Sequence, residues 1–274
     1  MKAEFYSENL SGSQFQRVDL AGSRFQLAKL AGVEFHGCEF TNARFRIIEM
    51  DGVTMRGVEL NDVEISGDIG NLTINGVEVA ELVEAELDRR HPERVKMRPA
   101  DAAGFREAWD ILERLWDGTV TRARRLDPAA LHESVDGEWS FIETLRHLVL
   151  VTDGWINRTV LGDPSPWHPL GLPWDDPDEQ RSLPPGLTRD RGARPSLAEV
   201  LALRRDRMAK VRQVVGGLTD AALDEDTKPA RAPGWPESRG YRLGDVLRHV
   251  FREEWEHRLY AERDLDSLEA SRRP

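Results

Sequence analysis

The chain lacks the features that mark several classes of protein. Among its 274 residues there is a single cysteine, Cys38, which excludes an internal disulfide and a multi-cysteine zinc site. No apolar run approaches the ~18 residues that a membrane-spanning helix needs, and residues 1–10 lack the apolar core of a secretory signal. We therefore expect a cytoplasmic protein with no membrane contact.

Basic residues are too few for a nucleic-acid-binding surface. Lys and Arg number 38 against 49 Asp and Glu, so the net charge is −11 and no basic stripe is visible. We expect no direct contact with nucleic acid. The hydrophobic fraction of 39% is that of a folded protein and excludes a long disordered polymer. At ~100–200 residues per domain, the length predicts one or two domains.

A five-residue repeat occupies the N-terminal part. A period of five matches neither a helix nor a strand, but it suits a chain that turns a corner every five residues. The residues two positions before each large apolar residue are mostly small or apolar, Cys38 among them, so both positions are expected to face inward. The large apolar residues are Phe5, Leu10, Phe15, Leu20, Phe25, Leu30, Phe35, Phe40, Phe45, Met50, Met55, Leu60 and Ile65.

This pattern resembles the pentapeptide-repeat family over residues 5–65. The resemblance implies a right-handed quadrilateral β-helix with four repeats per coil, and thirteen repeats give about three coils, or ~15 Å at a strand spacing of ~4.8 Å. After the repeats, residues 67–79 are expected to be extended and residues 79–91 to form a short helix, acidic first and basic last. We assign residues 1–80 to the β-helix and 81–100 to a helix and linker.

The remainder predicts a helical domain over residues 101–265, with a tail over 266–274. Asp101 is expected to cap the first helix, and Ser140 with Glu143 forms a capping box that starts the second. Four helices joined by two long connections predict a four-helix bundle. The helices are expected at 101–120, 140–160, 196–215 and 241–263, and the long loops at 162–195 and 230–240.

The apolar stripe of the last helix is interrupted by two polar residues. Leu243, Val246 and Val250 are followed at helical spacing by Glu253, His257 and Tyr260. A buried carboxylate is costly unless it is compensated, and residues four apart on a helix can bind one ion together. The alternative is a half-buried salt bridge. The neighbours Glu254 and Glu256 are interpreted as solvated.

Two segments, GEWSFIETLRHLV at residues 137–149 and HVFREEWEHRLY at 249–260, resemble the DinB-like superfamily in its actinobacterial branch. In that family a histidine of the second helix and two ligands four apart on the last helix bind a divalent metal. The resemblance covers about 100–265 and implies His147, Glu253 and His257 as the ligands. Many members have a histidine where this chain has Glu253. A similar His, Glu, His set occurs in the related mycothiol-dependent maleylpyruvate isomerases, which bind zinc.

The residue types fit that chemistry. Two neutral imidazoles and one carboxylate give a divalent cation three ligands and leave a position open for water or substrate. A metal there acidifies a bound water or thiol. The resemblance implies a low-molecular-weight thiol such as mycothiol as co-substrate. Zn²⁺ is the expected metal, with Ni²⁺, Fe²⁺ and Mn²⁺ compatible with the ligands. The sequence identifies no catalytic residue beyond the metal ligands.

Further residues were considered for the substrate. Arg158 shares the face of His147 and is a candidate for an anionic group, Trp155 for an aromatic pocket, and His168 for a loop that covers the site. Each has a structural alternative: a surface salt bridge for Arg158, core packing for Trp155 and a structural role in its loop for His168. His249, one turn before Glu253, is either a fourth ligand or a histidine that does not bind the metal.

Three functions follow. The first is a metal-dependent S-transferase or isomerase that acts on a small electrophile, with the repeats as a scaffold for a homodimer. The second, implied by the resemblance to pentapeptide-repeat proteins, some of which are acidic rods, is an interaction protein that imitates DNA and binds a topoisomerase. Residues 1–80 carry twelve acids and seven bases, a net charge of −5. However, a ~15 Å rod spans only about four base pairs at ~3.4 Å each. The third is a non-enzymatic stress protein with a vestigial metal site.

Overall fold

A computed structural model describes residues 4–26, 28–46, 48–173, 187, 190–231 and 234–272. By its internal contacts the chain divides into two compact units, and along the repeats the division falls between Ile48 and Glu49. Each unit is described by itself. The predicted loops at 162–195 and 230–240 lie in part outside the described residues.

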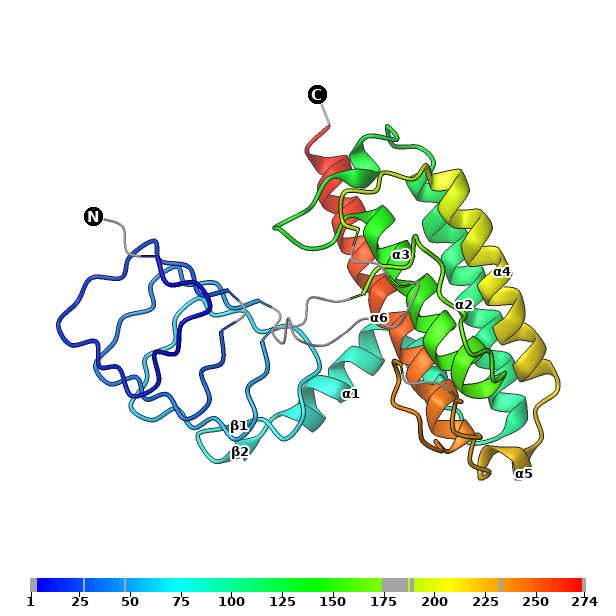
Figure 1. Ribbon diagram of the computed structural model, residues 1–274, viewed down its shortest axis with the longest axis horizontal. Helices are drawn as coiled ribbons and strands as arrows, with labels where there is room; N and C mark the ends of the chain where they lie inside the picture. The colour runs from blue at the N-terminus through cyan, green and yellow to red at the C-terminus, as the bar shows by residue number, and fades with distance from the viewer. Residues whose placement is uncertain are drawn as a thin grey trace. The chain divides into compact units, whose positions relative to one another are not determined.

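The repeats turn once every five residues, as predicted. One residue per repeat, two positions after each large apolar residue, has a positive φ, between 53° and 145° for those described. Glycine occupies most of these corners because it adopts positive φ without steric cost. In Figure 1 this part of the chain winds as successive open coils. The corner residues are Ser7, Gly12, Arg17, Gly22, Gly32, Gly37, Asn42, Gly52, Gly57, Asp62 and Gly67.

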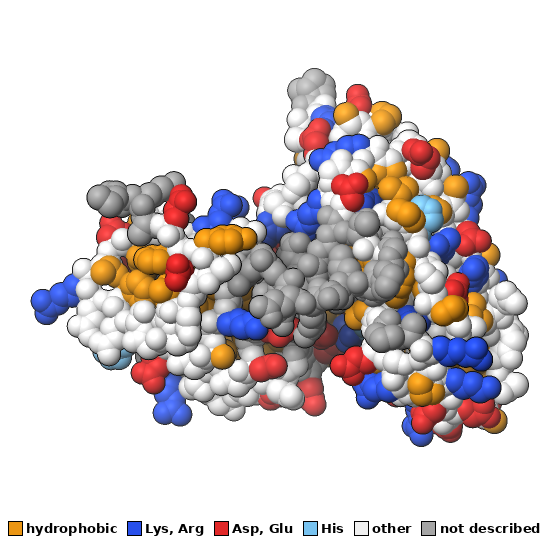
Figure 2. All heavy atoms as spheres, in the orientation of Figure 1, with side chains coloured by type: hydrophobic (Ala, Val, Ile, Leu, Met, Phe, Trp, Pro, Cys, Tyr) orange, Lys and Arg blue, Asp and Glu red, His pale blue; other side chains and the backbone are white. Residues whose placement is uncertain are grey.

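The large apolar residues of the repeats are not buried, so the prediction of an inward-facing core is wrong. Their exposed fractions run from 42% at Leu10 to 66% at Phe25, and Cys38 is exposed as well. Figure 2 shows orange apolar side chains on the surface of this part. The reason lies in the backbone: among the described repeats, backbone hydrogen bonds such as that from Ser13 N–H to Leu10 O stay within one turn. Coils without mutual hydrogen bonds do not close over their side chains.

The segment after the repeats is extended, as predicted, and it ends in a helix. Strands β1 (Thr73–Ile74) and β2 (Val77–Glu78) pair antiparallel around a turn. Helix α1 (Ala80–Arg90) follows, with Glu81 in its first turn and Arg89 and Arg90 in its last. The 3-10 helix η1 (Pro92–Met97) then occupies the predicted linker. Among the described residues β1 and β2 are the only strands, so no β-helix is seen.

The capping residues start the helices where the sequence predicts. Helix α2 (Ala102–Ala123) begins after Asp101, whose carboxylate accepts the Gly104 N–H at 2.7 Å. Helix α3 (Phe141–Thr152) begins with the capping box of Ser140 and Glu143, and continues as the π-helix η3 (Asp153–Val160). Two short helices, η2 (Ala130–His132) and α5 (Asp220–Leu223), lie in the connections.

Helices α4 and α6 complete the helical part. Helix α4 (Leu197–Gly216) has a second capping box, from Ser196 and Glu199. Helix α6 (Leu243–Ala270) extends seven residues beyond the predicted end near 263. It continues because Leu265 and Leu268 prolong its buried face.

The long helices pack pairwise around an apolar interior (Figure 1). Helix α3 lies against α4 and α6, and helix α2 lies against α6 and α4. One buried cluster surrounds Trp109 and Phe251, and a second surrounds Ile142 and Leu265. No helix of the described residues has the length and apolarity to cross a membrane.

Candidate metal centre

Helix α3 places His147 in the interior. All of its residues except Glu143 are buried, because the run FIETLRHLVLVT is apolar on most of its circumference. His147 itself is 6% exposed. The capping box at Ser140 fixes where the helix begins, and therefore which direction His147 faces.

Helix α6 supplies the other two predicted ligands from one face. Glu253 and His257 are four residues apart, so their side chains lie one turn from each other. Their side chains are 22% and 18% exposed, respectively, against 7% for the side chain of His147. The group is therefore partly buried, with Glu253 and His257 more exposed than His147.

The three side chains converge. The Nε2 atom of His257 lies 3.2 Å from Oε2 of Glu253, and the Nε2 atom of His147 lies 3.6 Å from the same oxygen. One potential ligand atom from each residue lies within 4.8 Å of the others. The two imidazole rings are 4.8 Å apart between centroids. Two nitrogens and one oxygen at these separations are arranged to surround one cation.

A backbone carbonyl sets the tautomer of His147. The Nδ1 atom lies 3.0 Å from the Leu172 carbonyl oxygen, which only accepts hydrogen bonds, so Nδ1 is the donor. In a neutral ring, Nε2 then carries a lone pair. That lone pair faces the carboxylate oxygen of Glu253, so a proton or a metal ion is needed between them.

The ionisation of the group favours a cation over a proton. Burial lowers the pKa of His147 from its ordinary value of 6.5, which keeps its ring neutral near pH 7. Burial works to raise the pKa of Glu253, but the His147 and His257 side chains beside its carboxylate outweigh this and hold that pKa below its usual range. Within the described part of the chain, no lysine or arginine pairs with Glu253. The donor set therefore fits a divalent cation in charge and in chemistry.

Aromatic rings surround the cluster. The Trp139 ring lies 4.5 Å from the His147 ring and is stacked on the His257 ring at 5.9 Å, and Tyr260 contacts His257 edge-on. On the other side of Glu253, the Nε2 atom of His249 lies 3.7 Å from Oε1. Three histidines thus flank one carboxylate, two on Oε2 and one on Oε1.

Of the three residues considered for substrate, Trp155 and Arg158 both lie against residues 234–241. The Trp155 ring is 4.7 Å from the His249 ring and 5.2 Å from the Tyr241 ring. Arg158 is 1% exposed, and its guanidinium lies against Gly234, where an added Cβ would be 3.1 Å from Cζ. Arg158 is therefore buried and does not lie at the surface, where its structural alternative placed it.

His168 lies apart from the ligand cluster. Its Nδ1 accepts the Leu170 N–H at 3.1 Å, and its own backbone N–H donates to Asp153 Oδ2 at 3.2 Å. The ring thus bonds within its own loop, and the described residues include no contact between it and the ligands.

One interpretation from the sequence is wrong. Glu254 was expected in solvent, yet it is fully buried and accepts two hydrogen bonds from Arg204, at 2.8 and 2.6 Å. Glu256 is half-buried, and burial raises its pKa. The interpretation was wrong because α6 buries residues against α2 as well as against α3, and because Glu254 reaches Arg204 of α4.

Sequence reasoning missed two contributors to the centre. The Leu172 carbonyl has no signature in the sequence, because any residue carries that group. Arg146 is fully buried beside His147, and a charged residue inside the apolar run of α3 was a signal that could have identified it.

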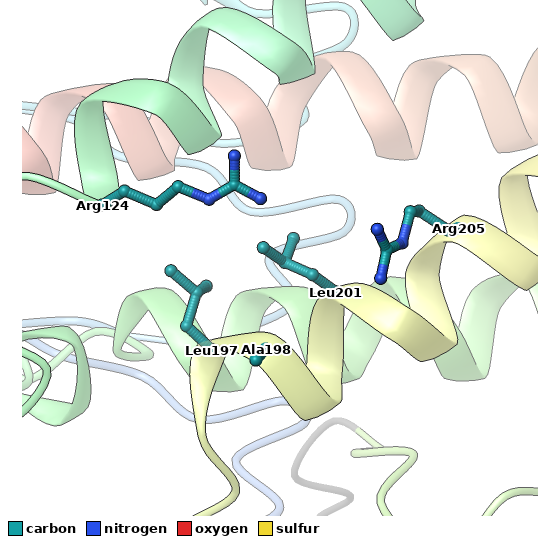
Figure 3. Close-up of a pocket in the computed structure, with 5 residues that line it drawn as sticks. All are labelled: Arg124, Leu197, Ala198, Leu201 and Arg205. Atoms are coloured by element: carbon teal, nitrogen blue, oxygen red, sulfur yellow. The ribbon is translucent and has the colours of Figure 1, made fainter.

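Two hollows in the surface of the described residues lie away from the cluster. One, of about 280 Å³, is lined by Arg124 and by the first turns of α4. In Figure 3 the guanidinium groups of Arg124 and Arg205 lie on either side of Leu201. None of the predicted site residues lines it.

Comparison with known families agrees with the division of the chain into a repeat part and a helical part. A helical domain with a His, Glu, His cluster is what the structure defines, and the sequence pattern of the DinB superfamily matches residues 111–261. The chain belongs to that superfamily. Pentapeptide repeats, in eight copies, match residues 9–46. The predicted fusion of the two is confirmed. Neither the curated proteins nor the solved structures gave a match to this chain.

Proposed function

We propose that the protein is a divalent-metal-dependent enzyme that joins a low-molecular-weight thiol to a small electrophile, or isomerises the electrophile through that thiol. The observation that carries the proposal is the convergence of His147, Glu253 and His257 on one point. Mycothiol represents the class of thiol, and Zn²⁺ is the metal that the nitrogen and carboxylate donors favour, while Ni²⁺, Fe²⁺ and Mn²⁺ use the same donor types.

A divalent metal bound there would supply Lewis acidity, which lowers the pKa of a water or thiol that binds beside the protein ligands. The protein's own residues orient the metal ligands and shield them from water. Leu172 holds the His147 ring with Nε2 toward Glu253. Trp139 covers both imidazoles with an apolar surface, which excludes water from that side.

The substrate is proposed to lie on the Glu253 Oε1 side. Trp155 and His249 form an aromatic wall there, and the buried guanidinium of Arg158 offers positive charge to an anionic group of the substrate. His168 is retained as a residue of the loop that approaches the site. Its bonds to Leu170 and Asp153 support a role in shaping that loop.

We also infer the finer architecture. One left-handed corner in every five residues supports a right-handed quadrilateral β-helix for the repeats, and the pairwise packing of α2, α3, α4 and α6 supports a four-helix bundle. The acidic charge supports a protein that does not contact nucleic acid. Cytoplasmic location and a homodimer scaffolded by the repeats complete the proposal.

Elemental analysis of the purified protein tests the first step. We expect about one equivalent of metal, lost in His257→Ala and retained in Glu256→Ala, a change one residue away. Thiol consumption is then measured against a panel of electrophiles, with the His257→Ala protein as the blank.

Stoichiometric metal with no turnover would favour the non-enzymatic stress protein. Folded protein that takes up no metal after metal addition would refute the enzyme proposal, and inhibition of topoisomerase supercoiling would favour the DNA-imitating alternative.

A further inference from the structure

The backbone of segment 168–173 is bonded at one end to η3 and at the other end to helix α3. At one end the His168 N–H donates to Asp153, which also accepts from Arg207 Nε at 2.9 Å and from Asn157 at 2.9 Å. Asp153 is fully buried. At the other end the Leu172 N–H donates to the Arg146 carbonyl at 3.2 Å.

The Arg146 side chain bonds the same segment a second time. Its Nε donates to the Leu170 carbonyl at 2.9 Å, and its Nη2 donates to the Asp190 carbonyl at 2.6 Å. Its Nη1 also donates, at 3.4 Å, to the carbonyl of Ala193. The side chain is fully buried, and each of these acceptors is a backbone oxygen.

This arrangement is unusual for a structural arginine. Burying a guanidinium without a carboxylate partner is costly, and burial lowers the pKa of Arg146. Arg204, by contrast, is buried with a bidentate carboxylate. A buried cation on neutral carbonyls holds backbone in place. The Leu170 carbonyl that it holds is two residues before the Leu172 carbonyl that bonds His147.

We propose that Arg146 is a positioning residue of the metal centre: through the segment 170–172 it holds the Leu172 carbonyl on His147 Nδ1, and so keeps Nε2 aimed at Glu253. This inference rests on the proposed metal site and names a residue that orients it. The planar guanidinium suits the task because it reaches separate acceptors in fixed directions, whereas a lysine ammonium is a point donor.

Removing a partner that orients a ligating histidine weakens metal affinity by about 10- to 100-fold. We therefore expect Arg146→Met to bind Zn²⁺ that much more weakly than the wild type, measured by competition with a chelator on the full chain. Arg146→Lys is expected to recover part of the loss. The matched control is Arg106→Met, because Arg106 also donates to a backbone carbonyl, that of Leu218 at 3.1 Å, away from the segment.

A second measurement separates positioning from loss of stability. The ¹⁵N shifts of the His147 ring in protein stripped with a chelator report its tautomer. The wild type is expected to show protonated Nδ1 and bare Nε2. Arg146→Met is expected to show a mixture of tautomers, and Arg106→Met the wild-type pattern. If Arg146→Met does not fold, Arg146→Lys carries both measurements.

The outcomes are distinct. This inference would be overturned if the folded Arg146 variants bound Zn²⁺ with wild-type affinity and showed a single His147 tautomer. If His147→Ala still lost binding, the proposed metal site would stand. Equal weakening in Arg106→Met and Arg146→Met would also overturn it, because the effect would then be general. Wild-type protein that binds no Zn²⁺ would overturn both proposals.

Discussion

Two neighbouring glutamates of α6 have opposite surroundings. Glu254 is fully buried and bound bidentately by Arg204, so its charge is compensated within the fold. Glu253 is partly exposed and surrounded by imidazoles, with no permanent cation on it among the described residues. A closed ion pair stabilises an arrangement of helices, whereas a carboxylate beside neutral histidines is prepared for a cation from outside. The comparison shows that burial of a charge does not by itself indicate function. What distinguishes the two carboxylates is whether a residue of fixed opposite charge pairs with them.

The largest effect on stability is expected at the buried pair of Arg204 and Glu254. Arg204→Met leaves the Glu254 carboxylate buried and uncompensated, which should cost about 3–5 kcal/mol in the free energy of unfolding. The double variant Arg204→Met/Glu254→Leu should recover most of that loss, because both charges are gone. Urea denaturation of the three proteins measures it. A single variant as stable as the wild type would show that the pair is not buried in solution.

The same experiment on the other glutamate should give a different result. Glu253→Gln keeps the size of the side chain and removes no partner of fixed charge, so its unfolding free energy without metal should change far less. With Zn²⁺ at about 100 times its Kd, the wild type should gain about 2.7 kcal/mol, and Glu253→Gln should gain none. The thermal shift on adding Zn²⁺ or EDTA measures this. Arg204→Met/Glu254→Leu should keep the thermal shift. Loss of the shift in this double variant would show that the Arg204–Glu254 pair and the metal centre are not independent.

The sequence anticipates one side of this comparison better than the other. The stripe of α6 placed Glu253 and His257 toward the interior, and the capping residues Asp101 and Ser140 placed the helix starts, because both depend on local periodicity and local hydrogen bonds. Glu254 was misjudged because its burial depends on Arg204, fifty residues away on another helix. The partner of a charge is set by tertiary packing, which a single sequence does not display.

The repeats show the converse. Their five-residue period fixed where the chain turns, and the positive-φ corners confirm it. It did not fix how the coils contact one another, so the exposure of Phe25 was not foreseen. A carbonyl such as that of Leu172 lies beyond sequence reasoning for a related reason, since its role depends only on where the backbone passes.

The pH dependence of stability should also distinguish the histidine cluster around Glu253 from the Arg204–Glu254 pair. Burial lowers the folded-state pKa of His147 and of His249 from 6.5. Below pH 6.5 the unfolded chain therefore binds more protons than the folded protein, so the free energy of unfolding of the chelator-treated protein should fall as the pH falls from 6.5 and be fully present above it.

Urea denaturation between pH 5 and 7.5 measures this slope. The slope should be reduced in His147→Leu/His249→Leu and unchanged in Arg204→Met/Glu254→Leu. A slope of equal size in all of these proteins would assign the pH dependence to groups outside the cluster.

The smallest effect is expected at His249, which tests how far the open side extends. Its Nε2 atom lies 3.7 Å from Glu253 Oε1, whereas His257 and His147 contact Oε2. If the cation is bound on the Oε2 side, His249→Ala should weaken Zn²⁺ binding by less than tenfold, or under about 1.4 kcal/mol. His257→Ala, measured in parallel by chelator competition, should weaken it by far more. Equal losses would make His249 a fourth ligand, and the site would then be closed to substrate rather than open, because four protein ligands complete the coordination of a structural zinc.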